Sequence, residues 1–550
     1  MESAGQVTES DPLKREEDGT KTVTAPPATD IKNRKWKEGL GCSRMSHWRT
    51  AVFFLSLFLC LTIVFAFSFI LPCPVRPQYL IIWNRTFSDA ATYDFLAIEH
   101  ASQDKVMDVL FVLKNTNGTQ NKSCADAGLP SPCLFVMAVD GTDGDTLWER
   151  PLGSEFHWAQ CGLEHRTPAS WHCLLSHSDN LTAIDKNTGH VVWQQPQPTG
   201  LLSSLPVLSV PDLDGDKVAD VVLVASDNTQ TQIILLSGKT GAQIGSTVVL
   251  DSFKSASHLV HLSKEGSYYV LLQNDTGVHG LALWRIAAEA KAELNANLKK
   301  DKHLEKKADA ATGLVLIHES DAVSLLRTQD TDDSSDLLVV SGNEVALVDG
   351  GKLQLRWTFN ISSVLGMPSF GHFNKDKVLD VVVEEDIGNY TKRIIILNGA
   401  SGGVLWELQL LASANANSPR PTSIHTTNSY SIFMFWGLMP SESNSSELIQ
   451  TDRRSYMLHP LYPKVLLEFT NALDHIISFK ATLMEHGRHA AYLLLTGPEN
   501  EGTEGTVILI KRKLKQDVPL CKVLRTGTSG GSATDEDIIE AFNRLRFSDW

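Results

Sequence analysis

The sequence predicts an all-β protein, with one transmembrane helix followed by a β-propeller ectodomain. Two observations lead to this prediction. A single stretch of the 550 residues is long and apolar enough to cross a bilayer, and two short motifs recur downstream of it at intervals of about 50 residues. The composition, 42% hydrophobic and 21% charged, is that of a folded globular protein. A net charge of −15 argues against nucleic-acid binding through a basic surface.

Residues 51–71 contain no charged side chain. A helix rising about 1.5 Å per residue needs about 20 residues to cross the hydrocarbon core of a bilayer. Six basic residues and only one acid, Glu38, lie within 32–49. The positive-inside rule therefore places residues 1–50 in the cytoplasm, as a disordered tail, and residues 72–550 outside. A helix buried in a protein core is the alternative reading of 51–71.

Glycosylation motifs support this topology independently. Every Asn-x-Ser/Thr motif follows the apolar segment, as expected for a domain that enters the secretory pathway. The acceptors are Asn84, Asn117, Asn121, Asn180, Asn274, Asn360, Asn389 and Asn444.

The cysteines divide in the same way, because six of the eight follow the apolar segment. An even number in an oxidising compartment predicts disulfides, and Cys124–Cys133 and Cys161–Cys173 close the shortest loops. Cys73 and Cys521 would remain, either to close the domain or to pair between chains. Histidines 157, 165 and 172 near the second pair make zinc the alternative there, but an oxidising lumen favours the disulfide.

The first repeat places an aspartate eight residues before a tryptophan, with a Gly-containing turn between two strand-like segments. A period of about 50 residues with four strands per unit is typical of a β-propeller, and we expect seven blades, with eight as the alternative. We interpret the tryptophans as packing between neighbouring blades. The copies are Asp140–Trp148, Asp185–Trp193, Asp349–Trp357 and Asn398–Trp406, and Ser237–Gly245 is degenerate.

The second repeat is a tight acidic loop that leads into a buried strand. Its best copy places aspartates at positions 1, 3, 5 and 9, and the carbonyl group at position 7 adds a further oxygen. Five or six oxygens around a hard cation indicate Ca²⁺, whereas an acidic turn that binds nothing is the alternative. The predicted ligands are Asp212, Asp214, Asp216, the carbonyl of Val218, and Asp220.

The same frame recurs with fewer carboxylates. Thr328, Asp330, Asp332 and Asp336 form a weaker candidate metal site. The loops 100–108 and 372–380 begin with histidine and carry too little charge, so we expect their last aspartates, Asp108 and Asp380, to cap the turn by hydrogen bonds.

These loops resemble the FG-GAP repeats of integrin α-subunit propellers, and Phe370-Gly371 is the clearest trace of that signature. The tryptophan repeat resembles that of quinoprotein-like propellers. The whole chain, with its basic tail, single span and ectodomain, resembles the "family with sequence similarity 234" proteins. This resemblance implies a type II membrane glycoprotein and no established activity. The implied organisation is a tail at 1–50, a span at 51–71, a propeller at 72–525, and a linker with a C-terminal helix at 526–550.

Only one spacing in the sequence fits a catalytic motif. Gly527–Gly531 fits G-x-S-x-G, but no histidine follows Ser529 and the surrounding sequence is that of a linker. We therefore expect a non-catalytic protein-interaction module at the cell surface or in the secretory pathway, with a protein partner that the sequence does not name. The alternatives are a lumenal quinoprotein-like enzyme and an accessory subunit of a membrane partner. Residues 287–310 predict one solvated helix, and Thr534 predicts the cap of the last helix.

Overall fold

The computed structural model divides into two compact units, Met1–Arg76 and Pro77–Trp550. The residues that it describes are 47–70, 82–115, 124–163, 173–197, 206–226, 229–292, 298–327, 336–411, 419–440, 454–469, 475–485, 487–500, 502–526 and 533–548.

The described part of the first unit is one helix, α1 (His47–Ile70), which contains nearly all of the apolar segment 51–71. Large apolar side chains on it are exposed, among them Phe53, Leu55 and Phe58 at 62%, 70% and 67%. Across the described residues, no helix meets the length and apolarity of a membrane span. The predicted span therefore stays a prediction, and the predicted tail lies almost entirely outside the described residues.

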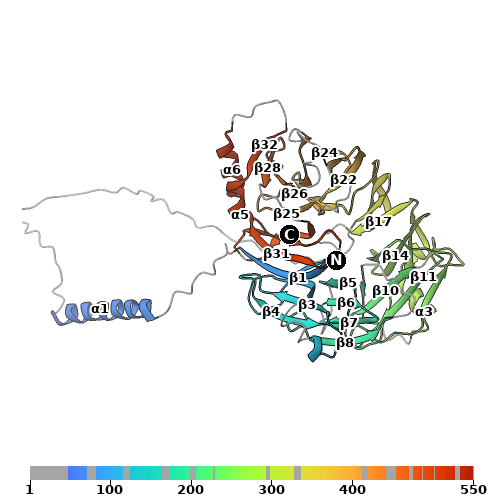
Figure 1. The fold of residues 1–550 in the computed structure, drawn as a ribbon, viewed down its shortest axis with the longest axis horizontal. Coiled ribbons are helices and arrows are strands. Elements are labelled where there is room, and N and C mark those ends of the chain that lie inside the picture. The colour runs from blue at the N-terminus through green and yellow to red at the C-terminus, as the bar shows by residue number, and fades with distance from the viewer. Residues whose placement is uncertain are drawn as a thin grey trace, which may run out of the picture. The chain divides into compact units, whose positions relative to one another are not determined.

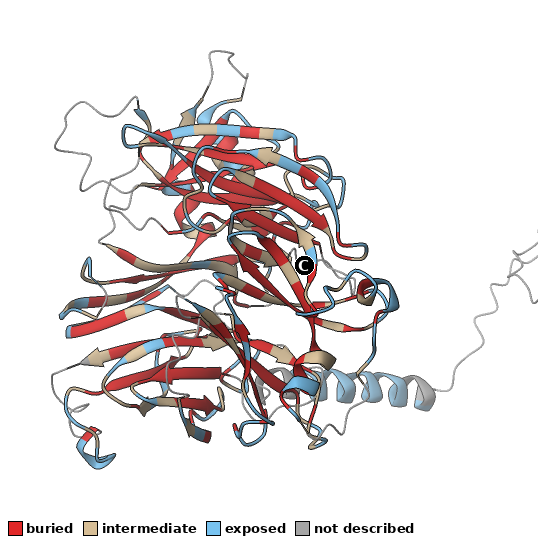
Figure 2. Ribbon diagram, turned by 90° about the vertical axis from the view of Figure 1, so that its right-hand side faces the viewer, coloured by how far each residue is buried: buried red, intermediate tan, exposed pale blue. Residues whose placement is uncertain are grey.

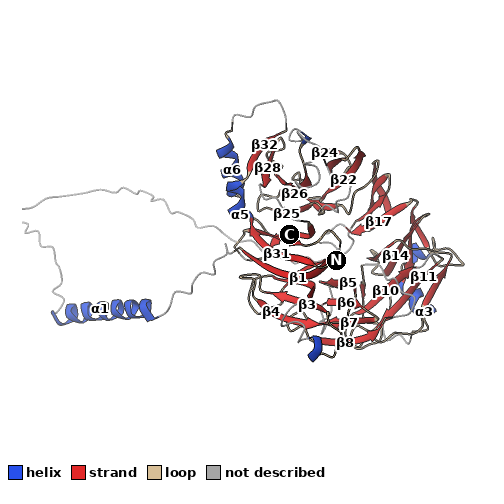
Figure 3. Ribbon diagram, viewed as in Figure 1, coloured by secondary structure: helices blue, strands red, loops and turns tan. Residues whose placement is uncertain are grey.

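The second unit is built of antiparallel strands, with only short helices between them (Figure 3). Its described residues form seven sheets. The largest has the spatial order β29-β30-β31-β1-β2-β3-β4. Its strands are β29 (Ile476–Leu483), β30 (Ala490–Thr496), β31 (Gly505–Lys513), β1 (Trp83–Glu99), β2 (Asp108–Asn115), β3 (Leu134–Val139) and β4 (Thr146–Pro151).

Five further sheets each contain four consecutive strands. They are β5 (Phe156–Cys161), β6 (Cys173–His177), β7 (Asn180–Ile184), β8 (Val191–Pro196); β9 (Leu208–Val210), β10 (Asp220–Ser226), β11 (Gln230–Leu236), β12 (Val248–Asp251); β13 (Ser257–Leu262), β14 (Tyr268–Asn274), β15 (Gly277–Ala282), β16 (Val315–His318); β17 (Ala322–Arg327), β18 (Leu337–Ser341), β19 (Glu344–Asp349), β20 (Gln354–Asn360); and β21 (Ser369–Gly371), β22 (Asp380–Gly388), β23 (Thr391–Leu397), β24 (Val404–Leu411). The last sheet contains β25 (Thr422–His425), β26 (Ser431–Gly437), β27 (Arg454–Leu458), β28 (Val465–Phe469) and β32 (Lys522–Arg525).

The sheets of this unit follow one another around a common centre (Figure 1). First strands of neighbouring sheets contact each other: β1 meets β5, β13 meets β9 and β17, and β25 meets β21 and β29. The ring closes through β1, since residues 83–90 pair with β31 and residues 90–99 pair with β2. The start and the end of the second unit are thus hydrogen-bonded side by side, which leaves no open sheet edge at the closure. This is an all-β propeller architecture.

The buried residues concentrate on the strands (Figure 2). Their aliphatic and aromatic side chains form the core between facing sheets. Between the sheet β5–β8 and the sheet β9–β12, for example, Leu174 and Trp193 pack with Val221, Leu223 and Ile234. The middle strands are buried on both faces, which explains their uninterrupted runs of Val, Ile and Leu.

Strand direction gives the propeller two distinct ends. Because successive strands are antiparallel, connections after the first and third strands of a sheet lie at one end, and connections after the second and fourth lie at the other. We call the first the Asp-loop end, since it carries the loop 212–220 between β9 and β10. We call the second the hairpin end, since it carries the tight β22–β23 turn at 388–391.

The helices differ in part from expectation. The single helix predicted at 287–310 is wrong, because the described residues form α3 (Leu283–Glu289) and α4 (Lys302–Glu305) instead. α3 buries Leu283, Ile286 and Ala287 and then stops, with Lys291 at φ +53°. Tertiary packing therefore outweighs the helix propensity of the Ala/Lys/Glu-rich segment. Two more short elements, α5 (Leu514–Asp517) and a 3-10 turn (Val518–Leu520), follow β31.

The C-terminal helix is confirmed as α6 (Asp535–Asn543). Thr534 caps it, and the Asp537 carboxylate completes a reciprocal capping box. Its buried Ile538 and Phe542 pack into the propeller core.

Both predicted disulfides are present, Cys124–Cys133 and Cys161–Cys173. Cys161 and Cys173 are direct partners in the β5–β6 ladder, so the bond staples that hairpin. Cys521 is a buried free thiol that donates to the Asp517 carbonyl, and burial raises its pKa to about 12. Cys73, His165 and His172 lie outside the described residues.

Candidate metal centre

The loop 212–220 brings three of its carboxylates together. Oxygens of Asp212, Asp214 and Asp216 all lie within 4.8 Å of one another, and the three side chains are half-buried. The backbone curls around them, since Gly215 and Lys217 have φ values of +88° and +71°. Three carboxylates this close repel one another unless a cation or protons compensate them. An all-oxygen donor set of this kind fits a hard divalent cation such as Ca²⁺.

Local hydrogen bonds hold these carboxylates in place. Asp212 accepts from the backbone N–H of Gly215 at 2.6 Å and of Lys217 at 2.8 Å. Asp214 accepts from the N–H of Asp216, and Asp216 accepts from that of Val218 at 2.8 Å. These short Asx-type turns preorganise the loop from its own sequence. The carbonyl of Val218 stays a predicted ligand.

Asp220 was predicted as a fourth carboxylate ligand, but it is not part of this cluster, and both of its oxygens have other partners. It is fully buried, and its two oxygens accept from the N–H of Leu213 at 2.6 Å and of Gly238 at 2.9 Å. Burial raises the pKa of Asp220 to about 6 against the lowering effect of those bonds, and the charges of Asp214 and Asp216 add to the increase. Asp220 therefore fastens the loop to the β11–β12 turn at the Asp-loop end.

The same fastening recurs in the loops with fewer acids. Asp108 accepts from Ala101, Ser102 and Gly141, and Asp380 accepts from Phe373, Asn374 and Gly399. The capping predicted for these two loops is confirmed. Burial raises the pKa of both carboxyls.

The weaker candidate metal site is only partly described. Asp336 accepts from the Gly350 N–H at 3.0 Å and pairs with Arg356 at 2.9 Å. Asp336 thus joins its loop to the following turn as Asp220 does, and the Arg356 guanidinium already compensates its charge. Thr328, Asp330 and Asp332 lie outside the described residues.

The glycines that donate to these aspartates belong to the tryptophan repeat, so the two repeats interlock. A Cβ on Gly238 would lie 1.9 Å from the Ala219 carbonyl oxygen. A Cβ on Gly141 would lie 1.8 Å from the Met107 carbonyl oxygen, and one on Gly399 would lie 1.9 Å from that of Leu379. Only glycine allows the turn to approach the loop closely enough for its N–H to reach the aspartate.

We call these hydrogen bonds between the aspartate loops and the glycine turns the Asp–Gly lock. Tryptophans connect this lock to the neighbouring sheet. The indole N–H of Trp193 donates to the Gly238 carbonyl at 3.0 Å, and that of Trp357 donates to the Gly399 carbonyl at 2.7 Å. Gly241 and Gly402, both at positive φ, lie against the faces of the same two indoles. The predicted packing between blades is therefore confirmed.

One member of this set was missed from the sequence. Trp83 donates to the Gly141 carbonyl at 3.2 Å, and Gly144 packs on its ring. Trp83 lies in the first half of β1, which pairs with β31 and forms the outer strand of the set β29–β31. Because β31 comes from the far end of the chain, no aspartate turn directly precedes Trp83 in the sequence. A signal was available, because a closed propeller needs an outer strand for its last blade and the first strand-like segment after 71 supplies it.

Trp83→Phe tests this closure. The substitution keeps an aromatic ring on Gly144 but removes the indole N–H, and leaves the Gly141 carbonyl without that donor. We expect a loss of about 1 kcal/mol in the free energy of unfolding, measured by chemical denaturation of the purified ectodomain. Trp193→Phe should cost a similar amount. No change in either variant would show that the ring contact alone carries the lock.

The sequence comparison decides the family. The FAM234A/B beta-propeller family model matches residues 83–548. The chain belongs to this family. Protein FAM234A of Homo sapiens is 37% identical over 544 residues, which cover 98% of this chain and 97% of that protein. Protein FAM234A of Bos taurus is 37% identical over 514 residues, 92% of each chain.

More distant similarities follow. Protein FAM234B of Gallus gallus is 28% identical over 477 residues, covering 82% of this chain and 75% of that protein. Among solved structures, BamB from Moraxella catarrhalis aligns with a TM-score of 0.38 and 12% identity, covering 78% of this chain and all of that chain. The resemblance to family 234 is confirmed.

Five of the eight predicted glycosylation sites fall within the described residues. Asn84, Asn360 and Asn389 are exposed, and Asn180 is half-buried. Asn274 is only 8% exposed, and its side-chain oxygen accepts from the N–H groups of Thr276 and Gly277. A glycan at Asn274 would require that turn to open. Asn117, Asn121 and Asn444 lie outside the described residues.

Proposed function

We propose that this FAM234 protein is a type II single-pass membrane glycoprotein whose propeller ectodomain is a non-catalytic protein-interaction module at the cell surface or in the secretory pathway. The observation that carries this proposal is the asymmetry of the sequence about residues 51–71. Basic residues cluster before this charge-free segment, and every glycosylation motif follows it.

Features of the second unit support the same compartment. Its two disulfides suit an oxidising lumen. Three acceptor asparagines, Asn84, Asn360 and Asn389, offer exposed side chains for glycosylation. In the first unit, the exposed apolar side chains of α1 suit a lipid environment better than water.

The role of the repeats favours an interaction module. The Asp, Gly and Trp residues that recur around the propeller are occupied with hydrogen bonds that join loops, turns and sheets. We infer that the repeats stabilise the fold, and that the surface outside them contacts a protein partner. The net charge of −15 makes a nucleic-acid partner a poor fit.

We further infer eight blades of four strands each. Counting the two halves of β1 separately divides the seven-stranded sheet into two sets, β1–β4 and β29–β31 with residues 83–90. The other six sheets supply one blade each, and β32 adds to the outer edge of the blade β25–β28.

Ca²⁺ is the cofactor we propose for the loop 212–220, in a structural role. Asp212, Asp214 and Asp216 would be its carboxylate ligands, with the Val218 carbonyl beside them. Asp220 would then stabilise the loop through the hydrogen bonds that it accepts from Leu213 and Gly238, rather than bind the ion directly.

Topology is tested on membranes from cells that express the full chain. Glycosidase should lower the mass of the protein, and protease added to intact vesicles should remove only residues before 51, because the rest is enclosed. Glycopeptide mapping should find glycans at Asn84, Asn360 and Asn389 and none at Asn274. An unshifted mass, or a protected N-terminus, would overturn the proposed topology.

A further inference from the structure

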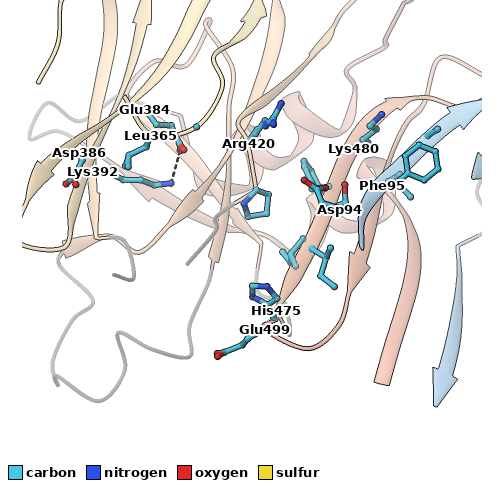
Figure 4. Close-up of a pocket in the computed structure, with 18 of the residues that line it drawn as sticks. Asp94, Phe95, Leu365, Glu384, Asp386, Lys392, Arg420, His475, Lys480 and Glu499 are labelled. Carbon is cyan, nitrogen blue, oxygen red and sulfur yellow. Dashed lines mark hydrogen bonds and ion pairs between the residues drawn. The ribbon is translucent and has the colours of Figure 1, made fainter. Parts of the chain in front are cut away.

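A cavity of about 1120 Å³ opens at the hairpin end of the propeller (Figure 4). Its walls come from the first strands β1, β5 and β29, from the chain just before β21 and β25, and from the β22–β23 hairpin. The cavity therefore lies at the centre of the ring. Most of its lining is at the opposite end from the loop 212–220, and residues 159–161 at the end of β5 extend it along the channel between the first strands. Its volume exceeds the roughly 300–1,000 Å³ of sites for drug-sized molecules.

Charged residues of both signs line this space. They are Arg420, Lys480, Asp94 and Glu499 (Figure 4), and none of these four side chains forms a hydrogen bond or ion pair with another residue in the described part of the chain. The Lys480 side chain reaches water, although protein atoms surround much of it. This partial burial lowers the pKa of Lys480, and the nearby carboxylates Glu99 and Asp94 oppose the lowering. By contrast, Lys392 and Glu384 satisfy each other at 2.7 Å in the wall.

Such a wall suits a polyhydroxylated ligand. Carboxylates accept hydrogen bonds from hydroxyl groups, and Arg and Lys side chains donate to hydroxyl oxygens. The two signs are mixed around the cavity, so a neutral ligand with many hydroxyls satisfies both without introducing a net charge. Tyr390, which is 59% exposed, adds ring surface to the same lining.

The rim of this cavity also carries a glycosylation motif. Asn389 lines the cavity, is exposed, and forms the sequence Asn389-Tyr390-Thr391. It lies in a two-residue turn, since Gly388 pairs with Thr391 and both intervening residues have positive φ, +52° and +56°. This hairpin geometry is well defined and fixes where the asparagine stands.

We propose that the N-linked glycan on Asn389 folds into this cavity and is held there by Arg420, Lys480, Asp94 and Glu499. The inference rests on the proposed lumenal location of the propeller, which exposes Asn389 to glycosylation. Because the sugar is covalently tethered at the rim, its effective concentration at the wall reaches the millimolar range. Individually weak hydrogen bonds are then enough to keep it bound. The glycan would close the hairpin end to large partners and leave the Asp-loop end free.

The test compares two glycans on the same folded protein. The full chain is purified in mild detergent from a mammalian secretory host, and Asn360 serves as the control because it is exposed on β20 and does not line the cavity. Site-resolved mass spectrometry follows removal of each glycan by peptide-N-glycosidase under native conditions. We expect release at Asn389 to be at least tenfold slower than at Asn360, and the two rates to become equal after unfolding. The Asn389 glycan should also be less trimmed.

Wall variants show whether the cavity causes that protection. Arg420→Ser with Lys480→Ser should keep the glycan but raise its release rate to that of Asn360. Lys254→Ser is the matched control, because Lys254 is an exposed lysine in a connection between sheets at the same end and does not line the cavity. It should change nothing.

The outcomes separate this inference from the proposed topology. A glycan at Asn389 released as fast as that at Asn360 overturns the inference and leaves the topology intact, as does an empty Asn389 beside an occupied Asn360. Absence of glycans at every site overturns the topology itself. Binding of a free saccharide by Asn389→Gln, but not by the wild-type protein, would support the inference, because the tethered glycan then competes for the same wall.

Discussion

Gly238→Ala is expected to destabilise the propeller by roughly 3–5 kcal/mol, the range of the most damaging single substitutions. The added Cβ would lie 1.9 Å from the Ala219 carbonyl oxygen and 3.2 Å from a methyl group of Val218, so the turn must move away from the loop. That movement stretches two bonds at once. The Gly238 N–H leaves the buried Asp220 carboxylate, and the Gly238 carbonyl leaves the Trp193 indole.

The measurement is the melting temperature of the purified ectodomain, together with its yield in the culture medium. Gly342→Ala is the matched control, because a Cβ there meets nothing within 4 Å and the residue does not have a positive φ. It should melt within a degree or two of the wild-type protein. If Gly238→Ala melts like Gly342→Ala, the close approach of turn and loop does not contribute to stability, and the lock proposed for the two repeats is wrong.

The sequence showed the aspartate loops and the tryptophan turns as two separate repeats, but not the hydrogen bonds that join them. Spacing at positions 1, 3 and 5 was enough to place Asp212, Asp214 and Asp216 together, because a tight loop brings alternate side chains to its inner side. The role of Asp220 could not be read from spacing. Its partner, Gly238, is 18 residues away on another connection, and pairing of β10 with β11 brings the two together.

The misses share a physical cause, namely that tertiary contacts override local signals. Residues 287–310 have helical composition, yet α3 ends where its buried face ends. Trp83 has no turn before it, because its strand closes the ring from the far end of the domain. In each case the deciding partner is supplied by the fold rather than by neighbouring residues.

Calcium should raise the melting temperature of the purified ectodomain, and chelator should remove that increase. A ligand that binds only the folded state stabilises it by RT ln(1 + [L]/Kd), about 2.7 kcal/mol at a hundredfold excess over Kd. Secretory and extracellular calcium concentrations make even a weak site useful. Asp214→Ala with Asp216→Ala should abolish most of the calcium-dependent increase, because two of the three clustered carboxylates are lost.

Asn374→Ala with Asp376→Ala is the matched control for this pair. Asn374 and Asp376 hold the same positions in the loop 372–380 and accept the same local N–H bonds, from Asp376 and Val378. Both double variants therefore lose similar turn bonds, but only the first loses the carboxylate cluster. Asp214→Ala with Asp216→Ala loses stability because turn hydrogen bonds are removed. In chelator, the loss of two mutually repelling carboxylates should offset part of this decrease in melting temperature. If calcium raises the melting temperature of that variant as much as it raises that of the wild-type protein, the ion binds elsewhere, and the loop 212–220 is an acidic turn held by its own hydrogen bonds and by those of Asp220.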